Sequence, residues 1–327
     1  FNHPLNLIVH QVAPAIAVGC PVIIKPAEDT PLSCFRFVQI LYESGLPEEW
    51  CQALTVNNTE VATELVTDER VNFLSFIGSA SVGWMLRSKL APGTRCSLEH
   101  GGVAPVIITE DTDIDYTLPL LGKGAFYHAG QVCVSVQRIY CHQSIADKVA
   151  DGLTDYANAA VIGDPVLPET EIGPLIRPRE VDRIEEWVNA AINEGAKLLC
   201  GGKRISESCY EATVLYDPHD NSTVSQKEIF GPVAIIYPYE NLDDAIARAN
   251  AVPYAFQAAV FGKNIDTLMH AAKHLDASAV MLNDHTAFRV DWMPFAGLKQ
   301  SGLGVGGIPY TMEDMQIDKL YVLRSHA

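Results

Sequence analysis

Short apolar runs alternate with longer helical segments along this chain, and this alternation restricts the possible fold more than any other feature. The runs are rich in valine and isoleucine, as at residues 21–25, 71–76, 106–108 and 139–141. Strands that are buried on both faces of a parallel sheet have this continuous apolar composition. Strands that alternate with helices form open α/β sheets, which bind ligands at the carboxyl ends of the strands. We therefore predict an α/β protein built on open parallel sheets.

The chain is long enough for two domains. It has 327 residues, whereas a single hydrophobic core stops growing at roughly 250–300 residues. The pair Gly101-Gly102 interrupts the alternation, and we interpret it as a hinge. We predict a first domain at residues 1–101, a second at residues 102–301, and a return segment at residues 302–327. Within that segment, residues 316–324 resemble an exposed-edge strand, which typically pairs with another subunit.

Composition excludes several classes of function. The formal net charge of −17 argues against a nucleic-acid partner, because such proteins present clustered Lys and Arg to the phosphates. Apolar runs such as residues 12–24 are broken by prolines and are shorter than the about 20 residues that span a bilayer, so we expect no membrane partner. The eight cysteines form no C-x-x-C pair. We expect reduced thiols in a cytoplasmic protein without a metal site.

Cys133 is the cysteine with the most suggestive surroundings. It lies just beyond a predicted helix at residues 115–127, in a stretch that Gly130 can turn. A thiolate is a strong nucleophile, but most cysteines are inert, buried side chains, and the residues around Cys133 do not by themselves decide between the two.

Two places could bind a nucleotide. The stretch from Gly78 to Gly83 lies between a predicted strand and a predicted helix, where free backbone N–H groups favour an anion. It matches neither a Walker loop nor G-x-G-x-x-G, and an ordinary tight turn is the alternative. Lys25 and Glu28 follow a buried strand, where a ribose could accept from the lysine and donate to the glutamate. A solvated ion pair is the alternative there.

Glu99 is the candidate general base. It lies between an apolar run and the glycine pair, where partial burial would raise the pKa of its carboxyl group into a useful range. The alternative is an ordinary carboxylate in a surface loop.

A set of ordered motifs decides among these alternatives. Together they resemble the signature of the NAD(P)-dependent aldehyde dehydrogenase superfamily, over essentially the whole chain. The motifs are Phe1-Asn2-His3-Pro4, Ile24-Lys25-Pro26-Ala27-Glu28, Gly78-Ser79-Ala80-Ser81-Val82-Gly83, Leu98-Glu99-His100-Gly101-Gly102, Gly130-Gln131-Val132-Cys133, Glu228-Ile229-Phe230-Gly231-Pro232 and Pro294-Phe295-Ala296-Gly297-Leu298-Lys299-Gln300-Ser301-Gly302. The resemblance implies a Rossmann-like coenzyme domain, a catalytic domain and a C-terminal oligomerisation strand.

The resemblance also implies a mechanism. Cys133 would attack the aldehyde carbon, and Asn2 with the Cys133 backbone N–H would stabilise the oxyanion. Glu99 would activate the water that hydrolyses the thioester. Members that transfer the acyl group to CoA generally lack this glutamate, so a free carboxylic acid is the implied product.

The cofactor residues follow from the same motifs. Glu228 and Phe230 would hold the nicotinamide ribose and ring, and Lys25, Glu28, Gly78 and Ser79 would hold the adenosine ribose and pyrophosphate. The carboxylate of Glu28 would repel a 2′-phosphate, which favours NAD over NADP.

Three positions depart from the family pattern. Phe1 stands where tryptophan is common, and Gln11 where lysine is frequent. Asn57 lies near the place where a glycine allows close approach to adenine.

The sequence says less about the pocket that binds the aldehyde. Arg289 falls in the loop that usually closes the pocket, so we expect a small aldehyde with its own anionic group. A local pair of Arg289 with Asp284 or Asp291 is the alternative. The tail from Gly304 to Met312 resembles the phosphonoacetaldehyde and lactaldehyde dehydrogenase-like subgroup. By motif position the pocket would also contain His3, Tyr127, His128, Val132, Val134 and Phe295.

The sequence is also compatible with two other functions. The chain begins at Phe1 without a methionine, and we expect an upstream segment that completes the coenzyme domain. A catalytically silent homologue with a binding or structural role is one alternative, and a thiol esterase that needs no NAD is another. For the active enzyme we expect a homodimer or homotetramer.

Overall fold

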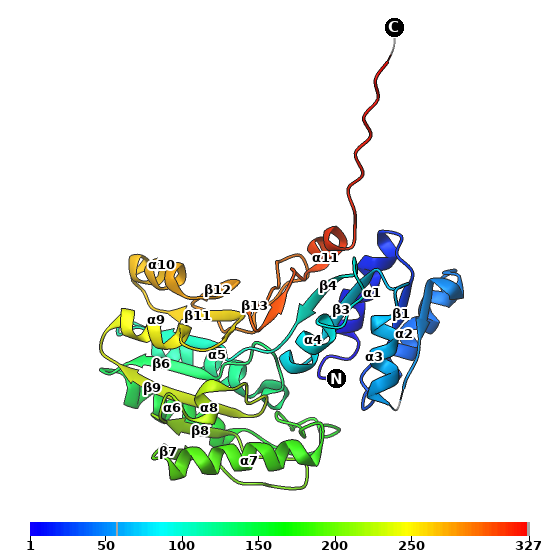
Figure 1. Ribbon diagram of the computed structural model, residues 1–327. Helices are drawn as coiled ribbons and strands as arrows, with labels where there is room; N and C mark the ends of the chain where they lie inside the picture. Colours follow the sequence, from blue (N-terminus) through cyan, green and yellow to red (C-terminus); the bar gives the residue numbers. More distant parts are fainter. Residues whose placement is uncertain (57, 326–327) are drawn as a thin grey trace.

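The computed structural model describes residues 1–56 and 58–325. Figure 1 shows two parts side by side: a large sheet with its helices, formed by the middle of the chain, and a smaller part formed by the first hundred or so residues and the C-terminal return. The N-terminus lies between the two parts (Figure 1). The predicted α/β fold class is confirmed, while the predicted domain bounds stay a prediction.

The large sheet has seven strands in the order β12-β11-β5-β6-β9-β8-β7. Its pairs are parallel except for β7 with β8. The residues of β5 are all buried, as a strand covered on both faces requires. The strands are β5 (Pro105–Ile108), β6 (Arg138–His142), β7 (Lys197–Cys200), β8 (Thr213–Tyr216), β9 (Val233–Tyr239), β11 (Gln257–Phe261) and β12 (Ala279–Leu282).

Helices between these strands bury their apolar stripes in one continuous core. Asparagine caps begin two of them: Asn241 accepts from the backbone N–H groups of Asp243 and Asp244, and Asn264 from those of Asp266 and Thr267. The helices are α5 (Ile114–Phe126), α6 (Ala146–Ala159), α7 (Pro178–Asn193), α8 (Thr223–Gln226), α9 (Leu242–Asn250) and α10 (Ile265–His274).

The smaller part repeats the alternation with short strands. β1 pairs with β2, and β3 pairs with β4, both in parallel. Its elements are α1 (Asn6–Ala17), β1 (Val22–Ile24), α2 (Leu32–Glu43), the 3-10 helix η1 (Glu48–Trp50), β2 (Cys51–Ala53), α3 (Thr59–Thr67), β3 (Phe73–Ile77), α4 (Ala80–Arg87) and β4 (Arg95–Glu99).

A late segment joins the two parts and thereby positions the end of β4. Its first strand, β13 (Leu298–Lys299), pairs with β10 (Tyr254–Ala255), and its second, β14 (Gly302–Leu303), pairs antiparallel with β4. Between them, the Ser301 carbonyl accepts from the His100 backbone N–H at 2.9 Å, and the Ser301 hydroxyl accepts from the Ala255 N–H at 3.0 Å. Glu99, the last residue of β4, is therefore tied to the larger part.

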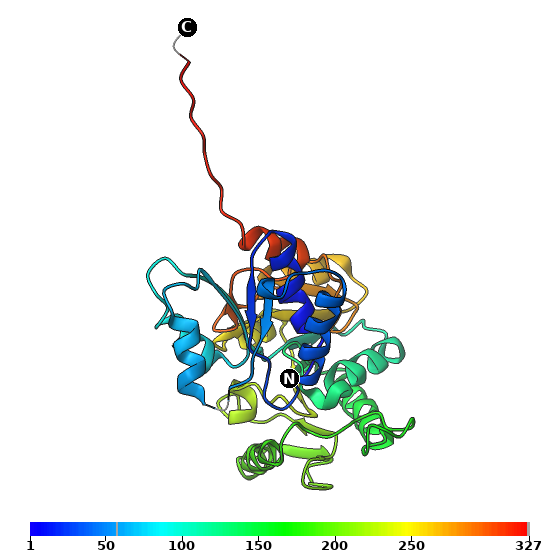
Figure 2. The ribbon, with the colours of Figure 1, turned by 90° about the vertical axis from the view of Figure 1, so that its right-hand side faces the viewer.

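Pro31 directly precedes α2, and no side chain caps that helix. After α11 (Ile308–Asp314), residues 316–325 run away from the body of the protein (Figures 1 and 2) and pair with no strand of the described chain. The strand predicted at 316–324 was expected to pair with a strand outside its own subunit, so it stays a prediction.

Within the described residues, no helix is both long and apolar enough to cross a membrane.

Candidate active site

Cys133 lies in a tight loop between α5 and β6. The chain turns through three consecutive residues with left-handed backbone conformation, His128 (φ 56°), Ala129 (φ 54°) and Gly130 (φ 67°). Such conformations are unfavourable for residues with a side chain and persist where the surroundings impose them. A Cβ on Gly130 would lie 2.0 Å from the Gly231 carbonyl oxygen, so only glycine fits. Backbone strain is thus concentrated directly before the cysteine.

The first residues of the chain lie against this loop. The Asn2 side chain donates from Nδ2 to the Gln131 carbonyl oxygen at 2.7 Å. The rings of His3 and His128 stack with their centroids 4.7 Å apart, and a ring nitrogen of His128 hydrogen-bonds to the Asn2 carbonyl. The segment that carries Asn2 is therefore held beside the cysteine loop, as an oxyanion donor there would require.

Cys133 itself packs among apolar side chains, together with Tyr127, Val132, Val134 and Phe295. Burial is the main cause that raises the pKa of its thiol to about 12, and the charges of Glu228 and Glu99 act in the same direction. Arg289 has the opposite, smaller effect. The thiol is therefore protonated at neutral pH and needs a base to become a nucleophile.

Glu99 is a buried carboxyl group whose charge affects the Cys133 thiol. Its carboxylate rests against Gly306, where a Cβ would lie 2.2 Å from Oε1. Burial raises the pKa of Glu99 from its ordinary value to about 7, and Arg289 lowers it slightly. A carboxyl group with this pKa exchanges protons readily near neutral pH.

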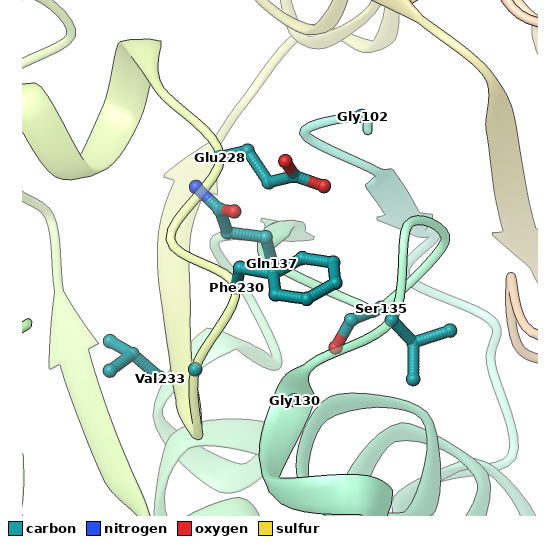
Figure 3. Close-up of a pocket in the computed structure, with 9 residues that line it drawn as sticks. Gly102, Gly130, Ser135, Gln137, Glu228, Phe230 and Val233 are labelled. Atoms are coloured by element: carbon teal, nitrogen blue, oxygen red, sulfur yellow. The ribbon is translucent and has the colours of Figure 1, made fainter. Parts of the chain in front are cut away.

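Glu228 lines a small pocket together with Gly102, Gly130, Ser135 and Phe230 (Figure 3). Its carboxylate packs so closely on Gly101 that a Cβ there would lie 1.8 Å from Oε1. Burial raises the pKa of Glu228 to about 8, against opposing effects of the Gly102 backbone and Arg183. Oε1 is buried and has no hydrogen-bond partner within the described residues. An unpaired buried acceptor of this kind fits the hydroxyl groups of a ribose.

Replacing Glu228 with glutamine should stabilise the protein in a pH-dependent way. The folded protein holds this carboxyl proton up to about pH 8, whereas the unfolded chain releases it near pH 4.5. The free energy of unfolding therefore falls as the pH rises between these values, and the glutamine variant lacks that fall. We expect the Tm of Glu228→Gln to exceed that of the wild type at about pH 8.5 by several degrees, and by much less near pH 5. Equal Tm differences at both pH values would contradict the buried, protonated state of Glu228.

The residues predicted to hold the adenosine end also lie at strand ends. Lys25 donates to Glu28 Oε1 at 2.8 Å, and Arg177 lies 4.0 Å from the other Glu28 oxygen. These cations partly neutralise Glu28, so its repulsion of a 2′-phosphate is weaker than the sequence suggests. Gly78 and Ser79 precede α4, and the Ser79 side chain does not cap that helix, so its first N–H groups stay available for a phosphate. Asn57 lies outside the described residues.

Arg289 makes no ion pair within the described residues. The alternative predicted from the sequence, an ion pair with Asp284 or Asp291, does not form within the described residues. Asp291 bonds to His10 at 3.1 Å, and Asp284 accepts from the His285 backbone N–H. The Arg289 guanidinium lies 3.8 Å from the centre of the Phe295 ring, and its Nη2 donates to His10 Nδ1 at 3.3 Å. Its Nε is buried without a hydrogen-bond partner in this part of the chain. Its charge lowers the pKa of both Cys133 and Glu99, although it forms no ion pair among the residues that the structure describes.

Two residues at the site escaped the sequence analysis. His10 is a buried polar side chain among the apolar residues of α1, and Gln137 is a buried polar side chain directly before β6. For His10 the available signal was a polar residue on an apolar helix face, whereas Gln137 lies close to Ser135 and Arg138 in the sequence and has no such signal. Two of the three positions that depart from the family pattern make defined contacts. Phe1 packs edge-on against the Phe230 ring, and Gln11 donates to the Ser75 hydroxyl at 2.8 Å.

Comparison with known proteins gives consistent matches. The model of the aldehyde dehydrogenase family matches residues 1–320. The chain is 38% identical over 323 residues to 3-sulfolactaldehyde dehydrogenase of Priestia aryabhattai, covering 99% of this chain and 67% of that protein. It is 37% identical over 327 residues to lactaldehyde dehydrogenase of Methanocaldococcus jannaschii, covering 99% of this chain and 70% of that protein. The chain thus spans about two thirds of the length of these relatives.

Solved structures agree with the sequence matches. Aldehyde dehydrogenase 21 of Physcomitrella patens, in complex with the reaction product succinate, superposes with a TM-score of 0.93 at 39% identity, over 96% of this chain and 65% of that one. Other matching structures contain NAD+ or NADP. The family match extends over nearly the whole chain, and the relatives match it in sequence and in fold. The chain belongs to the aldehyde dehydrogenase family.

Proposed function

We propose that the protein oxidises a small aldehyde carrying its own anionic group to the free carboxylic acid, with NAD as hydride acceptor. The observation that carries the proposal is electrostatic: Glu228, Glu99 and Arg289 all lie close enough to Cys133 to shift the pKa of its thiol. A nucleophile, a base, a cofactor-binding carboxylate and a substrate-binding cation would therefore share one site.

Covalent chemistry at Cys133 begins with loss of its proton. Glu99, whose pKa lies near 7, accepts that proton directly or through water. The thiolate attacks the aldehyde carbon, and the resulting oxyanion accepts hydrogen bonds from Asn2 Nδ2 and the Cys133 backbone N–H. The Asn2 amide has two N–H donors, and the bond to Gln131 uses one of them.

The second half of the reaction releases the acid. When bound, the nicotinamide ring supplies the redox chemistry by accepting a hydride from the substrate carbon. The acyl group then remains on the Cys133 sulfur as a thioester. Glu99 first releases the proton it took from Cys133 to solvent. It then deprotonates the water that attacks the thioester, so the product is a free carboxylic acid and the Cys133 sulfur leaves as the thiolate.

The cofactor assignment rests on residues at both ends of the binding site. The unpaired Glu228 oxygen and the Phe230 ring would face the nicotinamide ribose and ring. Lys25 and Glu28 would face the adenosine ribose, and the Glu28 carboxylate is the reason to propose NAD over NADP. Comparing KM for NAD with KM for NADP tests this choice, and a lower KM for NADP would contradict it.

Arg289 supports the anionic substrate. Arg289 is half-buried, with its Nε fully buried and unpaired, and its guanidinium has no carboxylate partner within the described residues. A carboxylate, sulfonate or phosphonate on the substrate would complete the pairing. The names of the relatives, 3-sulfolactaldehyde and lactaldehyde dehydrogenase, include one such anionic aldehyde.

Arg289→Leu should separate anionic from neutral substrates. We expect kcat/KM for succinic semialdehyde to fall roughly 10- to 100-fold, since a hydrogen bond to a charged group contributes about 1.5–3 kcal/mol. The kcat/KM for propanal should change by less than about threefold, measured near pH 8.5, where Glu99 stays ionised despite the loss of Arg289. Arg36→Leu, on the exposed face of α2, is the matched control. Equal losses for both aldehydes would contradict an anionic pocket.

A broader experiment tests the activity itself. Protein, NAD and a panel of aldehydes are mixed, and the absorbance of the reduced cofactor is followed beside a Cys133→Ser control. Reduction of NAD that depends on Cys133 supports the proposal. Absence of reduction with all aldehydes would favour a silent homologue, and cleavage of activated esters alone would favour a thiol esterase.

We also propose that subunits assemble through the extended tail. Ile317, Leu320, Val322 and Leu323 are each more than four-fifths exposed there, and such apolar residues are normally covered. A homodimer or homotetramer would pair the tail with a sheet edge of another subunit. Light scattering after gel filtration tests this, and a monomer at high concentration would contradict it.

Finally, we propose a cytosolic location. The eight cysteines are all free in the structure, as expected in a reducing compartment.

A further inference from the structure

Gln137 connects two segments of the active site that lie far apart in sequence. It directly precedes β6, and its side chain is 5% exposed. Its amide nitrogen donates to the carbonyls of Val224 at 2.9 Å and Lys227 at 2.8 Å, and its amide oxygen accepts from the Ile229 N–H at 3.0 Å. All three partners belong to residues 224–230, the end of α8 and the loop that follows it, and we name this segment the Glu228 loop.

These bonds flank Glu228. The Lys227 carbonyl precedes it and the Ile229 N–H follows it, so the peptide groups on both sides of Glu228 are held by one side chain. Arg183 fixes the next peptide group by donating to the Ile229 carbonyl at 2.7 Å. The Glu228 Oε1 atom has no partner of its own within the described residues. The Gly102 backbone acts on the carboxylate from outside the loop, and the held backbone of the loop sets where the Glu228 side chain begins.

Only a primary amide satisfies this arrangement. The loop offers two carbonyl acceptors and one N–H donor, and a glutamine side chain offers two N–H donors and one carbonyl acceptor. Glutamate at this position would lose both donors, and leucine would leave the three backbone groups without partners. Gln137 also lines the pocket beside Glu228 and Phe230 (Figure 3).

We propose that Gln137 is a positioning residue that sets the affinity for the nicotinamide half of the cofactor through Glu228 and Phe230. The inference deepens the proposed function and rests on it. Phe230 follows the held segment in a left-handed conformation (φ 49°), so a loosened loop would also release its ring. Lys25, Glu28 and Ser79 bond to no part of this loop, so the adenosine half should be unaffected.

Hydrogen exchange tests whether Gln137 holds the loop, without any need for activity. Amides of residues 224–230 should exchange at least tenfold faster in Gln137→Leu than in the wild type, while those of β5 keep their rates. Unchanged exchange in this loop would overturn the proposal even if NAD is reduced normally.

Ligand binding tests the functional consequence. In both Gln137→Leu and Gln137→Glu, the Kd for NAD should rise at least tenfold, and the Kd for ADP, which lacks the nicotinamide ribose, should change less than twofold. KM for NAD should rise more than kcat falls, and alkylation of Cys133 by iodoacetamide should stay within about twofold. These readouts separate a positioning role from a general loss of stability, which would weaken NAD and ADP binding alike.

Asn250→Leu is the matched control. The Asn250 amide likewise joins two backbone groups, the His274 carbonyl and the Asp276 N–H, both at 2.8 Å, outside the proposed site. It should lower Tm without changing the ratio of the NAD and ADP affinities. If the Gln137 variants behave like Asn250→Leu, the inference is wrong although the proposed function stands. A wild type that binds ADP but neither binds nor reduces NAD would contradict both.

Discussion

Cys133→Ser is expected to lower kcat for aldehyde oxidation by a factor on the order of 10⁴ or more, as the loss of a covalent nucleophile does in other enzymes. The Cys133 thiol already has a pKa of about 12 because it is buried near two carboxylates. A serine hydroxyl in the same place would be far harder to ionise. Without attack on the aldehyde, no tetrahedral carbon forms from which hydride can leave. Initial rates of cofactor reduction measure the effect.

The control for this experiment is Cys200→Ser. Cys200 is a partly buried free cysteine on β7, the edge strand of the large sheet, and its replacement should leave kcat within about twofold. NAD binding by Cys133→Ser should also be retained. Aldehyde oxidation that survives in Cys133→Ser, or that is lost equally in Cys200→Ser, would contradict the role of Cys133.

Glu99→Gln should trap the reaction after hydride transfer. A glutamine cannot accept a proton from water, and removal of a general base lowers a rate by about 10²–10⁴. We expect steady-state turnover to fall by such a factor while one equivalent of reduced cofactor still forms in a burst. Because Glu99 also accepts the Cys133 proton in the first step, the burst itself should be slower than in the wild type. Rapid-mixing absorbance resolves both phases.

The pH dependence of the wild type provides an internal check on Glu99. Only the ionised carboxylate accepts protons, and burial raises its pKa to about 7. Turnover should therefore rise as the pH increases through about 7 and then level off. Glu228 ionises at a pKa of about 8, so Glu228→Gln should be compared to separate the two groups. A profile that is flat between about pH 5 and 9 would contradict the assignment.

Regular elements with local signals could be predicted from the sequence. Helices α9 and α10 depend on local signals, because Asn241 and Asn264 cap them and each has a clear apolar stripe. The strands β7 and β8 and the short β13 and β14 were not predicted. Their existence depends on pairing between residues far apart in the chain, as for Gly302 with Glu99, and no local pattern encodes that pairing.

The candidate site shows the same limit. Ordered motifs indicated Cys133, Glu99, Asn2 and Glu228, and the structure brings their neighbourhoods together. The contacts that support them could not be predicted, because they join distant residues: Gln137 with Ile229, and His10 with Arg289. Motifs identify the residue types that a mechanism needs, whereas the hydrogen bonds that orient them depend on the whole fold.

Mass spectrometry of the trapped intermediate tests the central claim most directly. Glu99→Gln is mixed with NAD and succinic semialdehyde, quenched in acid and digested with trypsin. Residues 124–138 form a peptide with Cys133 as its single cysteine. The proposed mechanism predicts a succinyl thioester on this peptide, in proportion to the reduced cofactor formed and absent without NAD. Reduced cofactor without an acyl group on Cys133, or an acyl group on another cysteine, would contradict it.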